Sequence, residues 1–217
     1  MALKIGVVSQ KGGVGKSTLA RMIACEYAAS GWEVKIADMD LKQSTSYEWQ
    51  QGRLASGTQP AVSVEQFSSV SRALRTENTY DLLVFDSAPH ATKRTLEIAE
   101  VCDLVIIPTG LSRDDLVPTI KLAHELTAEG ISTEKVAIAL CKVGHSLLEI
   151  EETRAFIGAA GYHHLDGTIP ESTGYRRAQD IGRSITETRY SSLNEKAGQV
   201  MQAIVDCLEE LTTLQTA

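Results

Sequence analysis

The fold of this chain is decided by its first segment, Leu3-Lys4-Ile5-Gly6-Val7-Val8-Ser9-Gln10-Lys11-Gly12-Gly13-Val14-Gly15-Lys16-Ser17-Thr18. Residues 3–9 form a short β-branched run that predicts a strand, and a glycine-rich turn follows it at once. Residues from Lys16 to about Ala29 predict a helix, which Gly31 ends in the usual C-terminal position. The order strand, glycine-rich loop, helix is typical of a phosphate-binding unit.

The rest of the chain continues the alternation of strand and helix. Apolar runs predict strands at Glu33–Asp38, Tyr80–Asp86, Asp103–Pro108, Lys135–Cys141 and His164–Ile169. Helical patterns lie between them, including Asp114–Ala128 and Leu147–Ala159. Apolar strands alternating with helices imply a doubly wound, mostly parallel α/β sheet with helices on both faces. We expect a single domain over residues 1–217, with Gln50–Pro60 as a loop.

Composition limits the possible functions. The chain has 217 residues, a net charge of −7 and only 5% aromatic residues, so any nucleic-acid binding must come from a local basic patch. The four cysteines form no CxxC pair, which favours reduced, buried thiols over a metal site. We find no signal peptide and no apolar stretch of membrane-spanning length, and therefore expect a soluble cytoplasmic protein.

The loop from Lys11 to Thr18 has the chemistry of a phosphate cradle. Its glycines allow successive backbone N–H groups to approach phosphate oxygens, and the helix N-terminus adds a partial positive charge. Lys16 can reach the β- and γ-phosphates, and the Ser17 hydroxyl can ligate Mg²⁺. Lys11 has no place in a plain P-loop; it can reach a phosphate in its own site or a partner's, or lie solvated.

Acidic residues end two of the predicted strands. Asp86 follows an apolar strand at the edge where parallel strands form a crevice, and there it can hold Mg²⁺ through a water. Asp38 and Asp40 end the second strand, which points at the same crevice. A carboxylate at that place can orient an attacking water or stabilise it as it loses its proton.

These segments resemble the ParA/MinD ATPases with a deviant Walker A motif, here KGGVGKST over residues 11–18. The resemblance continues through residues 37–40, 84–89, 103–108, 169–171 and 175–178, and therefore covers nearly the whole chain. The length resembles the small ParA class, which lacks the N-terminal helix-turn-helix domain of the larger plasmid proteins.

The resemblance implies ATP and Mg²⁺ as cofactors and assigns roles to residues of the motif. Lys11 would be the signature lysine that crosses an ATP-sandwich dimer to the partner's phosphates. Lys16 would contact phosphate within its own subunit, Ser17 would ligate Mg²⁺, and Asp40 would support hydrolysis. Asp86 matches the Walker B aspartate. Residues resembling nucleotide-binding positions are Gly12, Gly13, Val14, Gly15, Thr18 and, bordering the adenine, Pro170 and Glu171.

Two segments depart from the family pattern. The family often reads DxDPQ after the second strand, whereas this chain has Asp40-Leu41-Lys42-Gln43. The usual PSPxD-like stretch is replaced by residues 110–115, Gly-Leu-Ser-Arg-Asp-Asp, to which we assign no contact.

Family members of this size bind duplex DNA without sequence preference as ATP-bound homodimers. The distribution of charge along this chain can be compared with that property. Residues 172–196 carry a net charge of +2, whereas the rest of the chain carries −9. This segment either forms a basic patch, doubled by two-fold symmetry, or ordinary solvated helix faces. The DNA-contacting candidates are Arg176, Arg177, Arg183 and Arg189.

Two alternatives share the fold. MinD-like proteins end in a basic amphipathic helix that binds the membrane. Here the polar face of the C-terminal helical pattern carries Asp206, Glu209 and Glu210 instead. We therefore expect a helix that packs on the core, and no membrane binding. Reductases of the nitrogenase iron-protein type bind an iron–sulfur cluster through cysteines, yet the spacing of Cys102 and Cys141 does not suggest one.

The resemblance therefore implies a slow Mg²⁺-dependent ATPase for plasmid partition, DNA segregation or cargo positioning. A ParB-like adaptor would stimulate hydrolysis, and the ATP-bound dimer would associate with the nucleoid.

Overall fold

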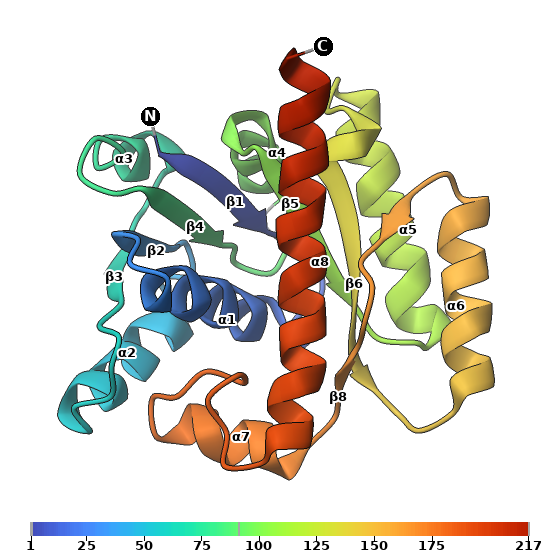
Figure 1. The fold of residues 1–217 in the computed structure, drawn as a ribbon. Coiled ribbons are helices and arrows are strands. Elements are labelled where there is room, and N and C mark those ends of the chain that lie inside the picture. The colour runs from blue at the N-terminus through green and yellow to red at the C-terminus, as the bar shows by residue number, and fades with distance from the viewer. Residues whose placement is uncertain (1, 91, 217) are drawn as a thin grey trace.

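The centre of the molecule is one sheet in which every strand pair of the described residues is parallel (Figure 1). The computed structural model describes residues 2–90 and 92–216. The strand order is β3-β2-β4-β1-β5-β6-β7, and β8 pairs with β6. The strands are β1 (Leu3–Val7), β2 (Val34–Asp38), β3 (Ser63–Gln66), β4 (Leu82–Asp86), β5 (Leu104–Thr109), β6 (Val136–Val143), β7 (His163–His164) and β8 (Ile169–Pro170).

Helices cover both faces of the sheet, which confirms the predicted doubly wound α/β class. One apolar cluster joins the sheet to α1 (Lys16–Ala29), α2 (Thr45–Ala55), α7 (Thr173–Asp180) and α8 (Ser191–Thr216). A second cluster joins the other face to α3 (Val70–Leu74), α4 (Thr92–Val101), α5 (Arg113–Ala128) and α6 (Leu147–Ala159). A short 3₁₀ turn, Thr133–Lys135, precedes β6.

The central strands are buried on both sides. In β4, Leu82 and Val84 belong to the cluster with α1 and α8, whereas Leu83 and Phe85 belong to the cluster with α4 and α5. This is the alternation that a strand between two helix layers requires. Polar groups of these strands can therefore reach a ligand only from the strand ends.

Most predicted elements are confirmed, and α1 and α6 have the expected limits. The single strand predicted at His164–Ile169 was wrong, because β7 and β8 are two short strands. They pair with different parts of β6, and Gly167 turns the chain between them with φ of +80°.

The predicted loop at Gln50–Pro60 was also wrong, because α2 continues to Ala55. Contacts with the distant segment after α7 hold the helix. The buried Arg53 guanidinium donates two hydrogen bonds of 2.7 Å to the Glu187 carboxylate. A side chain at Gly182 would lie 2.1 Å from the backbone nitrogen of Arg53, so this contact needs glycine.

The long C-terminal helix α8 lies across the α1 side of the sheet (Figure 1). It buries Ala197, Val200, Ile204 and Leu208, in agreement with the expected core-packing helix. Within the described residues, we find no helix with both the length and the apolar character needed to cross a membrane.

Candidate functional site

The loop from Lys11 to Thr18 connects the end of β1 to the start of α1, as predicted. Gly15 has φ of +113°, and a β-carbon on it would lie 3.2 Å from Cys141, so the turn into α1 requires glycine. Lys16 is only 7% exposed, and its ammonium donates a 2.9 Å hydrogen bond to the Lys11 carbonyl. The loop thus wraps around the Lys16 ammonium.

Opposing effects act on the pKa of the Lys16 ammonium. Burial lowers the pKa of Lys16, while the carboxylates of Asp86 and Asp40 raise it. These two acids are the predicted Walker B aspartate and the predicted hydrolysis residue. The structure therefore brings three of the predicted site residues into one electrostatic environment.

Strand register explains why the acids meet the loop. Asp86 is paired with Val7 of β1 on one side and with Asp38 of β2 on the other. All three residues end their strands, so their side chains gather at one edge of the sheet. Asp86 is buried, and Ser46 of α2 donates a 2.7 Å hydrogen bond to its Oδ2. Burial raises the pKa of Asp86, and the Ser46 hydrogen bond opposes that rise.

The residues fit a magnesium ion. Asp86 Oδ1 and the Ser87 hydroxyl are buried and have no hydrogen-bond partner among the described residues. The Ser17 and Thr45 hydroxyls are 3.0 Å apart where α1 and α2 begin. Mg²⁺ prefers oxygen ligands and keeps several waters, so an orphaned carboxylate oxygen beside hydroxyl groups suits it.

The two acids that follow β2 have different environments. Asp38 is fully buried and accepts hydrogen bonds from the backbone N–H groups of Asp40 and Tyr47, at 3.0 and 3.2 Å. Burial and the nearby Asp86 carboxylate raise the pKa of Asp38 to about 6. Asp40 is partly exposed and accepts from the N–H groups of Lys42 and Gln43, both at 3.1 Å. Asp40 is therefore the more accessible carboxylate.

Lys11 lies on the outer arm of the loop and contacts α5. Its ammonium forms an ion pair with Asp115 and donates to the Asp114 carbonyl at 3.2 Å. Partial burial acts to raise the pKa of Asp115, but hydrogen bonds from Lys11 and Ser112 lower this pKa below its usual value. The segment of residues 110–115, to which the sequence assigned no contact, thus holds the Lys11 ammonium through Asp115.

The predicted adenine border also reaches the loop. A hollow of about 380 Å³ is lined by Gly12, Gly13, Val14, Lys142 and Glu171, among others. Pro170 ends β8 beside Glu171, whose backbone N–H donates to the Val143 carbonyl. The backbone of Lys142 is left-handed, with φ of +56°. Glu171 thus lines the same hollow as the glycines, and the adenine-bordering role of Pro170 and Glu171 stays a prediction.

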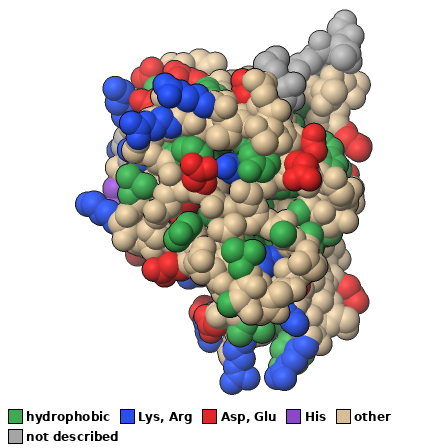
Figure 2. Space-filling model, turned by 90° about the vertical axis from the view of Figure 1, so that its left-hand side faces the viewer, with side chains coloured by type: hydrophobic (Ala, Val, Ile, Leu, Met, Phe, Trp, Pro, Cys, Tyr) green, Lys and Arg blue, Asp and Glu red, His purple; other side chains and the backbone are tan. Residues whose placement is uncertain are grey.

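The four predicted arginines are all exposed, around α7. Arg177, Arg183 and Arg189 line one hollow of about 420 Å³, whereas Arg176 pairs with Glu171 at 3.2 Å. Figure 2 shows lysine and arginine side chains protruding at the lower end of the molecule, the end at which α7 lies in Figure 1. Three of the arginines therefore form a common surface, here called the α7 basic surface.

Sequence reasoning missed the residues that connect this surface to the loop. The Gln179 side-chain oxygen accepts hydrogen bonds from Thr18 and from Arg21, both at 3.2 Å. The buried Arg21 also donates to Ser46, the residue that bonds Asp86. Gln179 lies more than 150 residues from α1 in the chain, and no local pattern indicates such a contact.

The cysteines are buried and free of disulfides, as expected. Burial raises the pKa of Cys102 well above its usual range and raises the pKa of Cys141 to about 12. Within the described residues, no group of three or more histidine, cysteine or acidic side chains is arranged to hold a metal. Neither finding supports a reductase-type cluster.

Comparison with known families now decides the family of the chain. Residues 5–204 match the model described as the CobQ/CobB/MinD/ParA nucleotide binding domain. The chain belongs to this family. The ParA/MinD resemblance inferred from the motifs is therefore confirmed. No curated protein matches the sequence at a significant level.

Solved structures of the ParA/MinD group share the fold. The apo McdA of Cyanothece superimposes with a TM-score of 0.73 at 16% identity, covering 94% of this chain and 100% of that one. The cell-division ATPase MinD of Pyrococcus furiosus gives 0.73 at 17%, covering 95% and 99%. The ParA of pNOB8, bound to nonspecific DNA, gives 0.61 at 13%, covering 95% and 99%. Other structures with this fold hold ATP, AMPPNP or Mg-ADP.

Proposed function

We propose that residues 1–217 form one ParA-type, Mg²⁺-dependent ATPase domain that acts as an ATP-driven dimerisation and DNA-binding switch. The observation that carries the proposal is the meeting of Lys16, Ser17 and Asp86 at one sheet edge, where Asp86 Oδ1 has no assigned hydrogen-bond partner within residues 2–90 and 92–216. Membership of a nucleotide-binding family supports the same conclusion.

Each residue of the loop has a role in this proposal. The backbone N–H groups of Gly12–Gly15 and the Thr18 region surround the phosphates, and Lys16 exchanges the Lys11 carbonyl for phosphate oxygens. Ser17, and Asp86 through a water, hold Mg²⁺, which neutralises phosphate charge when bound. Asp40 orients the attacking water or accepts its proton. Pro170 and Glu171 border the adenine.

Lys11 is proposed to complete the partner's site in a two-fold dimer. Its ammonium is partly exposed and held by Asp115, so it can leave this ion pair when phosphates of a second subunit approach. An exposed ion pair of this kind contributes about 0–1 kcal/mol, so breaking it opposes dimerisation only weakly.

The dimer is tested by size-exclusion chromatography with light scattering. We expect unmodified protein to form a dimer with Mg-ATP and not with ADP, and Lys11→Ala to stay monomeric with either nucleotide. Asp115→Ala is the matched control, since it breaks the same ion pair but leaves the lysine available, and it should dimerise with ATP. A Lys11→Ala variant that dimerises like the unmodified protein would refute the crossing role.

The α7 basic surface is proposed to hold duplex DNA without sequence preference. Its arginines are exposed, and the two-fold dimer would present them twice. The pNOB8 relative with nonspecific DNA supports this, because it has the same fold. Arg176 belongs to the proposed surface only when its pair with Glu171 opens.

Substitution of Arg177, Arg183 and Arg189 by alanine should lower the DNA affinity of the ATP-bound dimer at least tenfold. Removing phosphate contacts should also flatten the salt dependence of binding, and about 0.3 M salt should abolish binding by the unmodified protein. Fluorescence anisotropy with labelled duplexes of unrelated sequence measures both. The triple variant Arg72→Ala, Arg75→Ala and Lys93→Ala makes the same charge change among exposed residues elsewhere and should bind normally. Equal losses in both variants would contradict a local surface.

In the proposed cycle, a ParB-like adaptor on the cargo stimulates slow hydrolysis, the dimer opens and DNA is released. The protein would then be cytoplasmic and nucleoid-associated when ATP-bound, serving plasmid partition, DNA segregation or cargo positioning. No described feature favours a MinD-like membrane role, because the exposed side of α8 carries Asp206, Glu209 and Glu210. Anionic lipid would repel these acids.

A further inference from the structure

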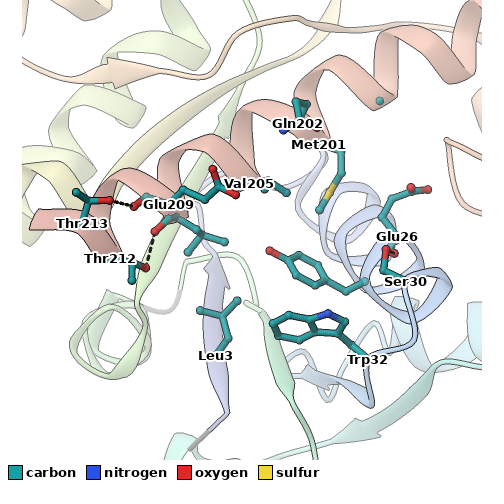
Figure 3. A pocket seen from close by; sticks show the side chains of 13 residues that line it. Leu3, Glu26, Ser30, Trp32, Met201, Gln202, Val205, Glu209, Thr212 and Thr213 are labelled. Atoms are coloured by element: carbon teal, nitrogen blue, oxygen red, sulfur yellow. Dashed lines mark hydrogen bonds between the residues drawn. The ribbon is translucent and has the colours of Figure 1, made fainter. Parts of the chain in front are cut away.

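A groove of about 920 Å³ lies between the last turns of α1 and the long helix α8. Leu3 of β1 and Trp32, which follows α1, form one side, and Met201 and Val205 of α8 form the other. Figure 3 shows the side chains of these residues facing one another across the space. None of the residues of the proposed nucleotide site lines this groove.

The groove and the proposed nucleotide site lie at opposite ends of β1 and α1. Leu3 begins β1, whereas the loop from Lys11 to Thr18 follows the end of that strand, about 16 Å away. Glu26 and Ser30 lie at the end of α1, whereas Lys16 begins it. A ligand in the groove therefore does not touch the phosphates.

Apolar and aromatic side chains line the groove together with an equal number of polar ones. Trp32 is 40% exposed and packs edge-on against Tyr27, with ring centroids 4.9 Å apart. Burial and the nearby Glu209 carboxylate raise the pKa of Tyr27. A partly exposed tryptophan beside an apolar groove is the kind of anchor that protein interfaces use.

The groove is long enough to hold a helix of about four turns. The lining positions on α8 run along one stripe from Gly198 to Thr213 and include Met201, Val205 and Glu209. They extend along about 23 Å of helix, which is about four turns. A β-carbon on Gly198 would meet nothing within 4 Å, so this end of the groove is open. Thr212 and Thr213 donate their hydroxyls to their own helix backbone.

The negative charges beside the groove favour a positively charged partner. Glu26 and Glu209 face the groove from α1 and α8, and no described lysine or arginine lines it. Neither carboxylate is in an ion pair within residues 2–90 and 92–216. Asp206 and Glu210 add further negative charge on α8, so DNA and anionic lipid are repelled.

We propose that the α1–α8 groove binds a cationic amphipathic helix of a partner protein. Its apolar stripe would pack on Trp32 and Val205, and its basic residues would pair with Glu26 and Glu209. This is the arrangement in which an amphipathic helix lies in an apolar groove and charges at the rim set its orientation. The inference does not depend on ATP hydrolysis or dimerisation.

The test uses the full chain without nucleotide and an 18-residue peptide of leucine and lysine with leucines at i, i+3, i+4 and i+7. Binding is followed by calorimetry and by Trp32 fluorescence, which is distinguishable because Trp49 is buried. We expect Glu209→Lys to weaken binding at least tenfold. Glu210→Lys is the matched control, because it makes the same charge change at the adjacent position, outside the groove, and should alter binding less than twofold.

A second variant separates shape from charge. Gly198→Gln places a neutral side chain in the open end of the groove and should weaken the peptide at least fivefold while the fold is kept. Equal effects of Glu209→Lys and Glu210→Lys, or equal binding of a peptide with glutamate in place of lysine, would overturn the proposal. So would binding of the unmodified chain to phosphatidylglycerol vesicles, or a nucleotide-independent dimer lost in Glu209→Lys.

Discussion

Replacing Lys16 by alanine is expected to abolish nucleotide binding, with Kd for Mg-ATP raised at least 100-fold. The Lys16 ammonium is the buried cation inside the phosphate loop, and its bond to the Lys11 carbonyl leaves donors for phosphate oxygens. Charge-assisted hydrogen bonds to phosphate contribute about 1.5–3 kcal/mol each, so losing two removes about 3 kcal/mol or more. Isothermal titration calorimetry measures the change directly.

The fold of Lys16→Ala should persist, because burial of the ammonium is itself unfavourable and alanine is a good helix former. Circular dichroism melting checks this. Lys121→Ala removes an exposed lysine on α5 and should bind Mg-ATP normally. If Lys16→Ala binds Mg-ATP within threefold of the unmodified protein, the loop does not bind phosphates as proposed.

Replacing Asp40 by alanine should stop hydrolysis, lowering kcat about 10²- to 10⁴-fold, while ATP binding and dimerisation persist. Asp40 is the accessible acid after β2, whereas both Asp38 oxygens accept backbone hydrogen bonds and Asp38 is fully buried. Phosphate release under saturating Mg-ATP measures the rate. Light scattering of the same sample measures the trapped dimer.

A conservative variant separates chemistry from loop structure. Asp40 also accepts hydrogen bonds from the backbone N–H groups of Lys42 and Gln43, so alanine could act by loosening the loop. Asp40→Asn keeps an oxygen acceptor for both bonds but lacks the negative charge, and we expect it to be as inactive as Asp40→Ala. Normal turnover in the asparagine variant would show that Asp40 only shapes the loop.

The sequence was most informative where a local pattern determines the backbone. Gly31 adopts positive φ just beyond the end of α1, and this end was predicted from that glycine, whereas the start at Lys16 was predicted from the helical pattern. The strand ends at Asp38 and Asp86 were predicted from apolar runs followed by an acid. Parallel topology then places these acids together, because carboxyl ends of parallel strands share an edge.

Elements held by distant contacts were not predictable. Gly52 and Gly57 indicated a loop, yet α2 persists because Arg53 is buried against Glu187. The same limit applies to the site. Lys11 meets Asp115, and Gln179 meets α1, across more than 100 residues of sequence. Nothing in the local pattern of either partner specifies such pairings, because they arise from the packing of helices on the sheet.

The side-chain oxygen of Gln179 connects α1, the helix that follows the phosphate loop, to α7, the helix that carries Arg176 and Arg177. Thr18 and Arg21, its two donors, belong to the first turns of α1. In the proposed switch, the Gln179 amide would thus connect nucleotide sensing to DNA contact. A substitution at Gln179 would then change how strongly nucleotide binding is coupled to DNA binding. The residues proposed for ATP hydrolysis would stay unchanged.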